Sequence, residues 1–237
     1  MMETEFKLPF SSLSDFELQN LFDNCIEDSG KTDFADYVAS LKGCIQLQDC
    51  RYYTETDFNN QFHNFAKFVN FSVLHLNIRC LNSKIRGFCQ LIYNLDYTFD
   101  VIVLSELWAY NVKYYCNILP EYQFHYKLPE DSKVGGVGIF VRNCYTVQEI
   151  THLDIDSSQD CKLENLWLRI SSESKKLIVG GIYRHPNQNI TEFKCKIEQV
   201  LQSLSNHSSP CIIAGDINID LIKFESHSGT AACSIYR

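Results

Sequence analysis

The chain has 237 residues, of which 45% are hydrophobic and 21% charged, a balance typical of a globular protein with a substantial buried core. Its 16 phenylalanines and 13 tyrosines exclude disorder over most of the length. The formal charge of −8 is concentrated at the start, because residues 1–70 hold twelve acidic and five basic side chains whereas residues 71–237 hold seventeen and sixteen. Neither part has a strong basic excess, so any contact with nucleic acid is expected to be weak and salt-sensitive.

The 11 cysteines are odd in number and none of them forms a Cys-x-x-Cys pair. This spacing argues against a disulfide framework or a structural zinc site and favours reduced thiols inside the cell. No apolar run approaches the roughly 18 residues of a membrane helix, and no apolar run follows a positively charged start. We therefore expect neither a membrane span nor a signal peptide.

The first 70 residues predict three short helices. A capping-box pattern at residues 14–17 begins the first, and Asp33 precedes the second. The third has an apolar face made of Phe58, Phe62 and Phe65. Because helices this short are marginal on their own, we predict an acidic, partly mobile helical extension over residues 1–70 and a main domain over residues 71–237.

From residue 71 the pattern changes to alternating strands and helices. A strand at 71–77, a helix at 83–95 and a strand at 100–106 form one strand–helix–strand unit. Short apolar stretches that favour antiparallel strands follow at 122–127, 137–142, 163–170 and 177–183. A helix at 191–204 and a strand at 211–216 complete a second α/β unit. The order predicts two sheets packed face to face with helices outside.

Polar side chains stand where several of these strands end. They are Asn77, Glu106, Tyr183, and Asp216 with Asn218. Alternate strand residues share a face, so the last two are expected side by side. Taken singly, each has a structural explanation: a turn cap, a solvated strand end, a core ring, or ordinary turn residues. Their shared position favours one site, because ligand groups collect at the carboxyl ends of strands.

The residue types suit hydrolysis of a phosphate ester. Glu106 would bind Mg²⁺ or Mn²⁺, with the amide oxygen of Asn77 beside it. Asp216 would orient or deprotonate the attacking water. Asn218 and the hydroxyl of Tyr183 would donate hydrogen bonds to phosphate oxygens. No other small-molecule cofactor is expected.

Two arginines flank the expected site. Arg79 and Arg184 are candidates for contacts with DNA phosphates. The alternative for both is a solvated surface position.

Five segments in order resemble the endonuclease/exonuclease/phosphatase superfamily, and in particular the apurinic-type endonuclease domain of non-LTR retrotransposons. They are Leu-Asn-Ile-Arg-Cys-Leu-Asn-Ser-Lys at 76–84, Leu-Ser-Glu-Leu-Trp at 104–108, Gly-Gly-Val-Gly-Ile-Phe-Val at 135–141, Ile-Tyr-Arg-His-Pro at 182–186 and Gly-Asp-Ile-Asn-Ile-Asp at 215–220. The resemblance implies a four-layer αββα sandwich of two mixed sheets, an α/β fold. It also implies that Glu106 and Asn77 lie at the metal, and that Tyr183, Asp216 and Asn218 position phosphate and water.

The resemblance further implies a biological setting. The domain would nick target DNA in the nucleus, and the exposed end would prime a reverse transcriptase domain of the same parent element. One departure stands against this: the family's later Ser-Asp-His is missing, and the only histidine after Asp216 is His227. We therefore expect a domain that is incomplete at the C-terminus, which puts the activity of this chain in question. The alternatives are a non-catalytic retroelement remnant and a phosphatase of the same superfamily.

Overall fold

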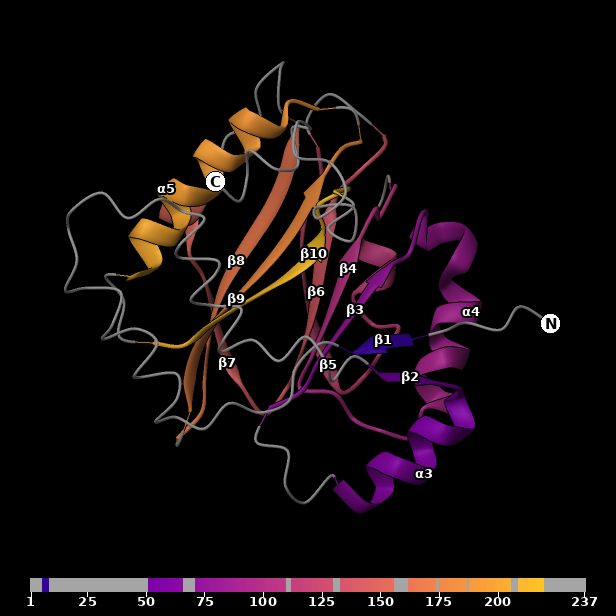
Figure 1. Cartoon of the computed structure of the whole chain (residues 1–237). Helices are drawn as coiled ribbons and strands as arrows, with labels where there is room; N and C mark the ends of the chain where they lie inside the picture. The colour runs from indigo at the N-terminus through magenta and orange to yellow at the C-terminus, as the bar shows by residue number, and fades with distance from the viewer. Residues whose placement is uncertain are drawn as a thin grey trace. The chain divides into compact units, whose positions relative to one another are not determined.

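The computed structural model describes part of the chain, and that part falls into two units (Figure 1). The described residues are 6–8, 51–65, 71–109, 112–129, 133–155, 162–173, 175–186, 188–205 and 209–219. One unit comprises Met1–Asn64 with Leu221–Arg237, and the other comprises Phe65–Asp220. The domain boundary expected between residues 70 and 71 stays a prediction.

The first unit contains a strand pair and a helix among its described residues. Strands β1 (Phe6–Leu8) and β2 (Arg51–Tyr53) pair antiparallel, and helix α3 (Glu55–Phe65) follows. Thr54 caps the helix, since its hydroxyl oxygen accepts a hydrogen bond from the backbone N–H of Asp57 at 3.1 Å. Helix α3 confirms the third predicted helix. The two helices predicted before it lie outside the described residues.

The second unit is built on two four-stranded mixed sheets (Figure 1). One sheet has the order β3 (Val73–Asn77), β4 (Val101–Ser105), β6 (Val137–Arg142), β5 (Tyr122–Lys127). The other has the order β10 (Cys211–Asp216), β9 (Lys176–Arg184), β8 (Leu163–Ser171), β7 (Thr146–Glu149). Two short 3₁₀ helices are η2 (Val112–Tyr115) and η3 (Thr151–Leu153).

Each sheet contains one parallel pair joined through a helix. Helix α4 (Leu81–Asn94) connects β3 to β4, and helix α5 (Ile190–Ser205) connects β9 to β10. Parallel strands need a crossover of this kind. In the register of the two pairs, Asn77 lies opposite Ser105 and Asp216 lies opposite Tyr183. The carboxyl ends of the strands in each pair therefore reach the same edge of their sheet.

The core lies between the two sheets and consists mostly of β-branched side chains. Its fully buried members include Val101, Val103, Val137, Ile139 and Val179. Gly181 lets the sheets approach closely, because a Cβ there would lie 2.6 Å from the Cγ1 of Val137.

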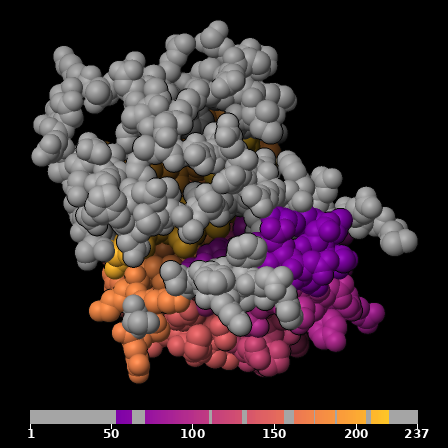
Figure 2. Space-filling model, turned by 60° about the horizontal axis from the view of Figure 1, so that its bottom comes forward, coloured from indigo at the N-terminus to yellow at the C-terminus, as the bar shows by residue number. Residues whose placement is uncertain are grey.

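The helices cover the outer faces of the sheets. On one side, Phe88 of α4 stacks on Phe140 with ring centroids 5.9 Å apart. On the other, Phe193 of α5 belongs to a buried cluster with Trp167 and Ile178. Figure 1 shows α4 and α5 on opposite sides of the paired sheets. Figure 2 shows, in space-filling form, residues of the second unit coloured from magenta to orange side by side along one face. The predicted αββα sandwich is confirmed.

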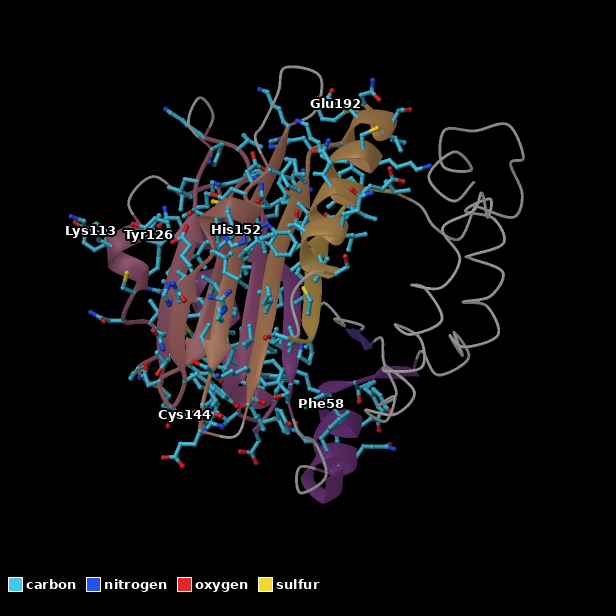
Figure 3. All side chains as sticks on the ribbon, turned by 90° about the vertical axis from the view of Figure 1, so that its left-hand side faces the viewer. Phe58, Lys113, Tyr126, Cys144, His152 and Glu192 are labelled. Atoms are coloured by element: carbon cyan, nitrogen blue, oxygen red, sulfur yellow. The ribbon has the colours of Figure 1, made fainter. Side chains whose placement is uncertain are left out.

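A hydrogen-bonded carboxylate fastens the amino end of β4. Asp100 accepts hydrogen bonds from the backbone N–H and the hydroxyl of Ser72, at 2.8 and 2.9 Å, and from the Tyr145 hydroxyl at 2.6 Å. Cys144, which directly precedes Tyr145, lies at one end of the sandwich in Figure 3. Glu192, in the first turn of α5, lies at the other end. No described helix is long and apolar enough to cross a bilayer.

Candidate active site at the carboxyl ends of four strands

Asn77 joins two carboxylates that come from different sheets. Its Nδ2 donates to Oε1 of Glu106 at 2.7 Å and to Oδ2 of Asp216 at 2.6 Å. Asn77 ends β3 and Glu106 directly follows β4, whereas Asp216 ends β10 of the second sheet. The structure thus brings together the three residues that were predicted to hold the metal and the attacking water.

Beyond the ends of β3, β4 and β6, the loops at the site are still joined to one another by backbone hydrogen bonds. The Cys80 N–H donates to the carbonyl of Glu106 at 2.9 Å, and the Trp108 N–H donates to the carbonyl of Gly135 at 2.9 Å. Five non-glycine residues in these loops have positive φ angles between 42° and 80°: Arg79, Cys80, Glu106, Trp108 and Asn218. Side chains seldom adopt this backbone region, and such strain clusters at functional sites.

A buried arginine fixes the loop after β10. Arg184 is 2% exposed, and its guanidinium donates to the carbonyls of Ile217, Asn218 and Gln188 at 2.6, 2.7 and 2.8 Å. The side chain of Asn218 in turn donates to the Arg184 carbonyl at 2.7 Å. This geometry gives Arg184 a role in holding the loop, and its burial speaks against the alternative of a solvated surface position. The predicted contact of Arg184 with a DNA phosphate stays a prediction.

Asp216 and Asn218 form a local turn. The backbone N–H of Asn218 donates to Oδ1 of Asp216 at 2.9 Å, which leaves Oδ2 for Asn77. The exposed side chain of Asn218 faces the Arg184 carbonyl. Asn218 therefore lies at the site as predicted, and its hydrogen bond to phosphate stays a prediction.

Tyr183 is buried next to both carboxylates. It is 2% exposed and lies opposite Asp216 in the β9–β10 register. Burial raises the pKa of the phenol most, and the negative charges of Glu106, Glu164 and Asp216 and a hydrogen bond to Glu106 raise it further. The phenol thus stays protonated at neutral pH and can donate a hydrogen bond.

His75 precedes the site on β3 and stays neutral. Its Nε2 lies 3.0 Å from the Ser105 hydroxyl. Burial lowers the pKa of the imidazole to about 4, against an opposing effect of Asp216. His75 is therefore a neutral, hydrogen-bonded histidine beneath the site.

Arg79 lies on the exposed side of the site. Its guanidinium carbon is 5.6 Å from the centroid of the Trp108 ring, within the range of a cation–π contact. Arg79 is exposed and Trp108 is half-buried. A contact between Arg79 and a DNA phosphate stays a prediction that this exposure permits.

Two residues next to Tyr183, Glu164 and His185, were not predicted from the sequence as part of the site. Glu164 is the second residue of β8 and His185 directly follows β9, and Oε1 of Glu164 lies 2.8 Å from Nε2 of His185. Glu164 lies between Leu163 and Asn165 in a strand that is otherwise largely apolar, and an acid in such a strand was the available signal of a buried carboxylate. His185 shares a strand face with Tyr183 by alternation.

The oxygen donors at the site suit a hard divalent cation. The described residues contain no cluster of three His, Cys, Asp or Glu side chains that could hold a metal. Mg²⁺, however, commonly takes only one or two carboxylates and completes its shell with water and substrate oxygens. Glu106 and Asp216, with the amide of Asn77 between them, provide such a set.

Comparisons with known proteins agree with this architecture. The family model described as "Endonuclease/Exonuclease/phosphatase family" matches residues 74–231. No curated protein sequence matches the chain significantly.

Three solved structures illustrate the likeness. A D. rerio TDP2 complex with single strand DNA product is 21% identical with a TM-score of 0.50, and the match covers 67% of this chain and 65% of that one. The mannosyl-6-phosphatase Bt3783 of Bacteroides thetaiotaomicron is 15% identical with a TM-score of 0.50 and 70% coverage of each chain. The endonuclease domain of the telomere-specific non-LTR retrotransposon TRAS1 is 13% identical, with a TM-score of 0.49 and coverage of 69% and 68%. At these identities the likeness concerns the fold.

Proposed function

The chain belongs to the endonuclease/exonuclease/phosphatase family, whose members are hydrolases of phosphate esters that generally use divalent metals, and on this premise we propose that it is a metal-dependent DNA endonuclease. The observation that carries the proposal is the convergence of Glu106 and Asp216 on one amide, that of Asn77, within 2.7 Å. Like charges repel, so two carboxylates from separate sheets approach each other only where a donor or a cation lies between them. Their approach is understandable as a site for a cation and a phosphate.

Glu106 and Asn77 would hold Mg²⁺ or Mn²⁺. The Asn77 amide now presents its nitrogen to the carboxylates, and a half-turn about its last bond would present the oxygen to a cation instead. Bound there, the ion would polarise a phosphoryl oxygen and stabilise developing negative charge.

Asp216 would orient the attacking water and take its proton. Its Oδ1 is fixed by the Asn218 backbone N–H, so the carboxylate is held for proton transfer at Oδ2. Tyr183, kept protonated by burial and by its acidic neighbours, would donate to a phosphate oxygen. The Asn218 amide would make a second such bond.

The choice of DNA rests on two further points. The five ordered segments between residues 76 and 220 resemble the retrotransposon type of this family, and the D. rerio TDP2 structure of similar fold contains a single-stranded DNA product. Nicking would supply a primer end to a reverse transcriptase domain of the parent element, and the protein would then act in the nucleus. Exposed Arg79 would contact the DNA backbone.

Conversion of supercoiled plasmid to the nicked form tests the proposal directly. The 237-residue protein with Mg²⁺ should nick the plasmid, EDTA should stop the reaction, and Asp216→Asn should lower the rate by about 100-fold or more. Asp96→Asn is the matched control, since Asp96 is an exposed acid just beyond α4, and it should nick at the rate of the unmodified chain.

Other outcomes identify the alternatives. Hydrolysis of p-nitrophenyl phosphate without nicking would support a phosphatase. Absence of both activities with Mg²⁺ and with Mn²⁺ would support a non-catalytic remnant.

A further inference from the structure

A buried acid–histidine pair lies beside Tyr183 and has no part in the reaction described so far. Oε1 of Glu164 is 2.8 Å from Nε2 of His185, and the two side chains are only 6% and 13% exposed. Burying a carboxylate is costly unless it is paired and hydrogen-bonded. Because two hydrophobic side chains could occupy these buried positions at lower cost, we expect the Glu164–His185 pair to have a function beyond packing.

The pair touches Tyr183 from two directions. Glu164 is the cross-strand partner of Tyr183 in the β8–β9 ladder, and directly opposed residues of such a ladder have neighbouring side chains. The His185 ring lies 4.9 Å from the Tyr183 ring between centroids, at an interplanar angle of 56°. Tyr183 thus has this pair as neighbours on the β8 side and Asp216, its partner in the β9–β10 register, on the other.

The backbone around the pair leaves it little freedom. Gly135 has a φ of 117°, and a Cβ at this position would lie 2.9 Å from Oε1 of Glu164. The Gly135 carbonyl accepts the Trp108 N–H at 2.9 Å, two residues beyond Glu106. The same glycine therefore packs on the pair and holds the loop of the predicted metal ligand. On the other side, the His185 N–H donates to the Lys162 carbonyl at 3.2 Å.

We propose that Glu164 and His185 are positioning residues that hold the phenol of Tyr183 in its reactive orientation. The His185 ring limits rotation of the tyrosine ring, and Glu164 fixes His185 through the hydrogen bond to Nε2. The hydroxyl of Tyr183 is then directed toward Glu106 and the phosphate position. This role rests on the proposed function for its effect on catalysis, but the orientation itself is a property of the folded chain.

A double-mutant cycle on plasmid nicking tests the catalytic part. Glu164→Gln and His185→Gln should each lower kcat by about tenfold with KM unchanged, and Tyr183→Phe should lower it by about 100-fold. In the Tyr183→Phe background, Glu164→Gln should have no further effect. Additive losses would overturn the proposal, because a merely structural role would lower the rate equally with or without the hydroxyl. Glu149→Gln, an exposed acid on β7, should leave kcat unchanged.

A second measurement separates this proposal from the proposed function. In protein labelled with ¹³C at Cζ of its 13 tyrosines, the resonance that disappears in Tyr183→Phe identifies Tyr183. Glu164→Gln and His185→Gln should shift that resonance and leave the distant Tyr93 resonance in place. An unchanged Tyr183 resonance would overturn the proposal even in an active enzyme. A shifted resonance in a chain that does not nick DNA would support the positioning role while the proposed function fails.

Discussion

Asn77 and Asp216 are 139 positions apart in the sequence and are joined by a hydrogen bond of 2.6 Å between Nδ2 and Oδ2. Asn77 ends an edge strand of one sheet and Asp216 ends an edge strand of the other. This bond therefore crosses the sandwich, and the geometry of the site depends on how the two sheets pack. The core between the sheets is consequently part of what positions these two side chains.

Glu106→Gln should abolish stabilisation by Mg²⁺. A ligand that binds only the folded state raises its stability, by about 2.7 kcal/mol at a hundred times its Kd. The unmodified chain should therefore melt at a temperature that rises with Mg²⁺ concentration, and the variant should melt at the same temperature with and without the ion. Differential scanning calorimetry in Mg²⁺ and in EDTA measures this. The Asp96→Asn control should respond as the unmodified chain does, and an equal response from Glu106→Gln would remove Glu106 from the metal site.

Asn77→Asp should make the fold dependent on the cation. The amide donates to Glu106 and Asp216, so a carboxylate in its place would repel both. In EDTA we expect a loss of about 1 kcal/mol, or roughly 3 °C in melting temperature. Mg²⁺ should raise the melting temperature of this variant more than that of the unmodified chain. A variant that is equally stable in EDTA would show that the two carboxylates are not close in solution.

The elements of the sandwich could be predicted from the sequence because most of them are strongly patterned. The two buried strand–helix–strand units have apolar strands and helices of ordinary length, and both were confirmed. Strand β7 was missed, since three of its four residues are exposed and no apolar run marks it. Residues 146–149 form a strand because they pair with β8, and the local sequence holds no signal of that pairing.

The residues of the candidate site that lie at strand ends could be predicted from the sequence, whereas those brought in by pairing across strands could not. Asn77, Glu106 and Asp216 were placed together because each ends or directly follows a strand of a parallel pair. Glu164 lies at the start of an antiparallel strand, and only the β8–β9 register brings it to Tyr183. The burial of Arg184 likewise depends on the loop after β10, whose carbonyls have no sequence signature.

Gly135→Ala should destabilise the fold by about 1–3 kcal/mol. The backbone there has a φ of 117°, which side chains rarely adopt, and the new Cβ would lie 2.9 Å from the Glu164 carboxylate. Gly87→Ala is the matched control, because a Cβ there meets nothing within 4 Å inside helix α4. That change should stabilise the protein by about 0.5–1 kcal/mol, since alanine favours helices. Urea titrations compare the two, and equal effects would contradict the strained geometry at Gly135.

Arg184→Lys should lower activity even though the charge is kept. The guanidinium donates to three carbonyls of the segments around residues 188 and 217–218, and a lysine ammonium cannot match that planar fork. Unsatisfied buried carbonyls should reduce stability by about 1–3 kcal/mol, and kcat for nicking should fall because Asn218 loses its support. A surface arginine would behave differently: replacement of exposed Arg79 by Lys should leave stability unchanged within about 0.5 kcal/mol.

Tyr145→Phe should change stability and its pH dependence without changing activity. The Tyr145 hydroxyl donates to Oδ1 of Asp100 at 2.6 Å. Asp100 precedes β4 whereas Glu106 follows it, so this bond lies at the other end of the strand from the candidate site. Loss of a bond to a charged acceptor should cost about 1.5–3 kcal/mol. Burial, followed by the hydrogen bond and charge of Asp100, raises the pKa of this phenol. The unfolded phenol ionises near pH 10 while the folded one stays protonated, so its contribution is fully present below that pH and declines as the pH rises above it. The variant should therefore lose less stability between pH 9 and 11 than the unmodified chain, as measured by urea unfolding. A parallel decline in both proteins would show that the Tyr145 hydroxyl is not bonded to Asp100.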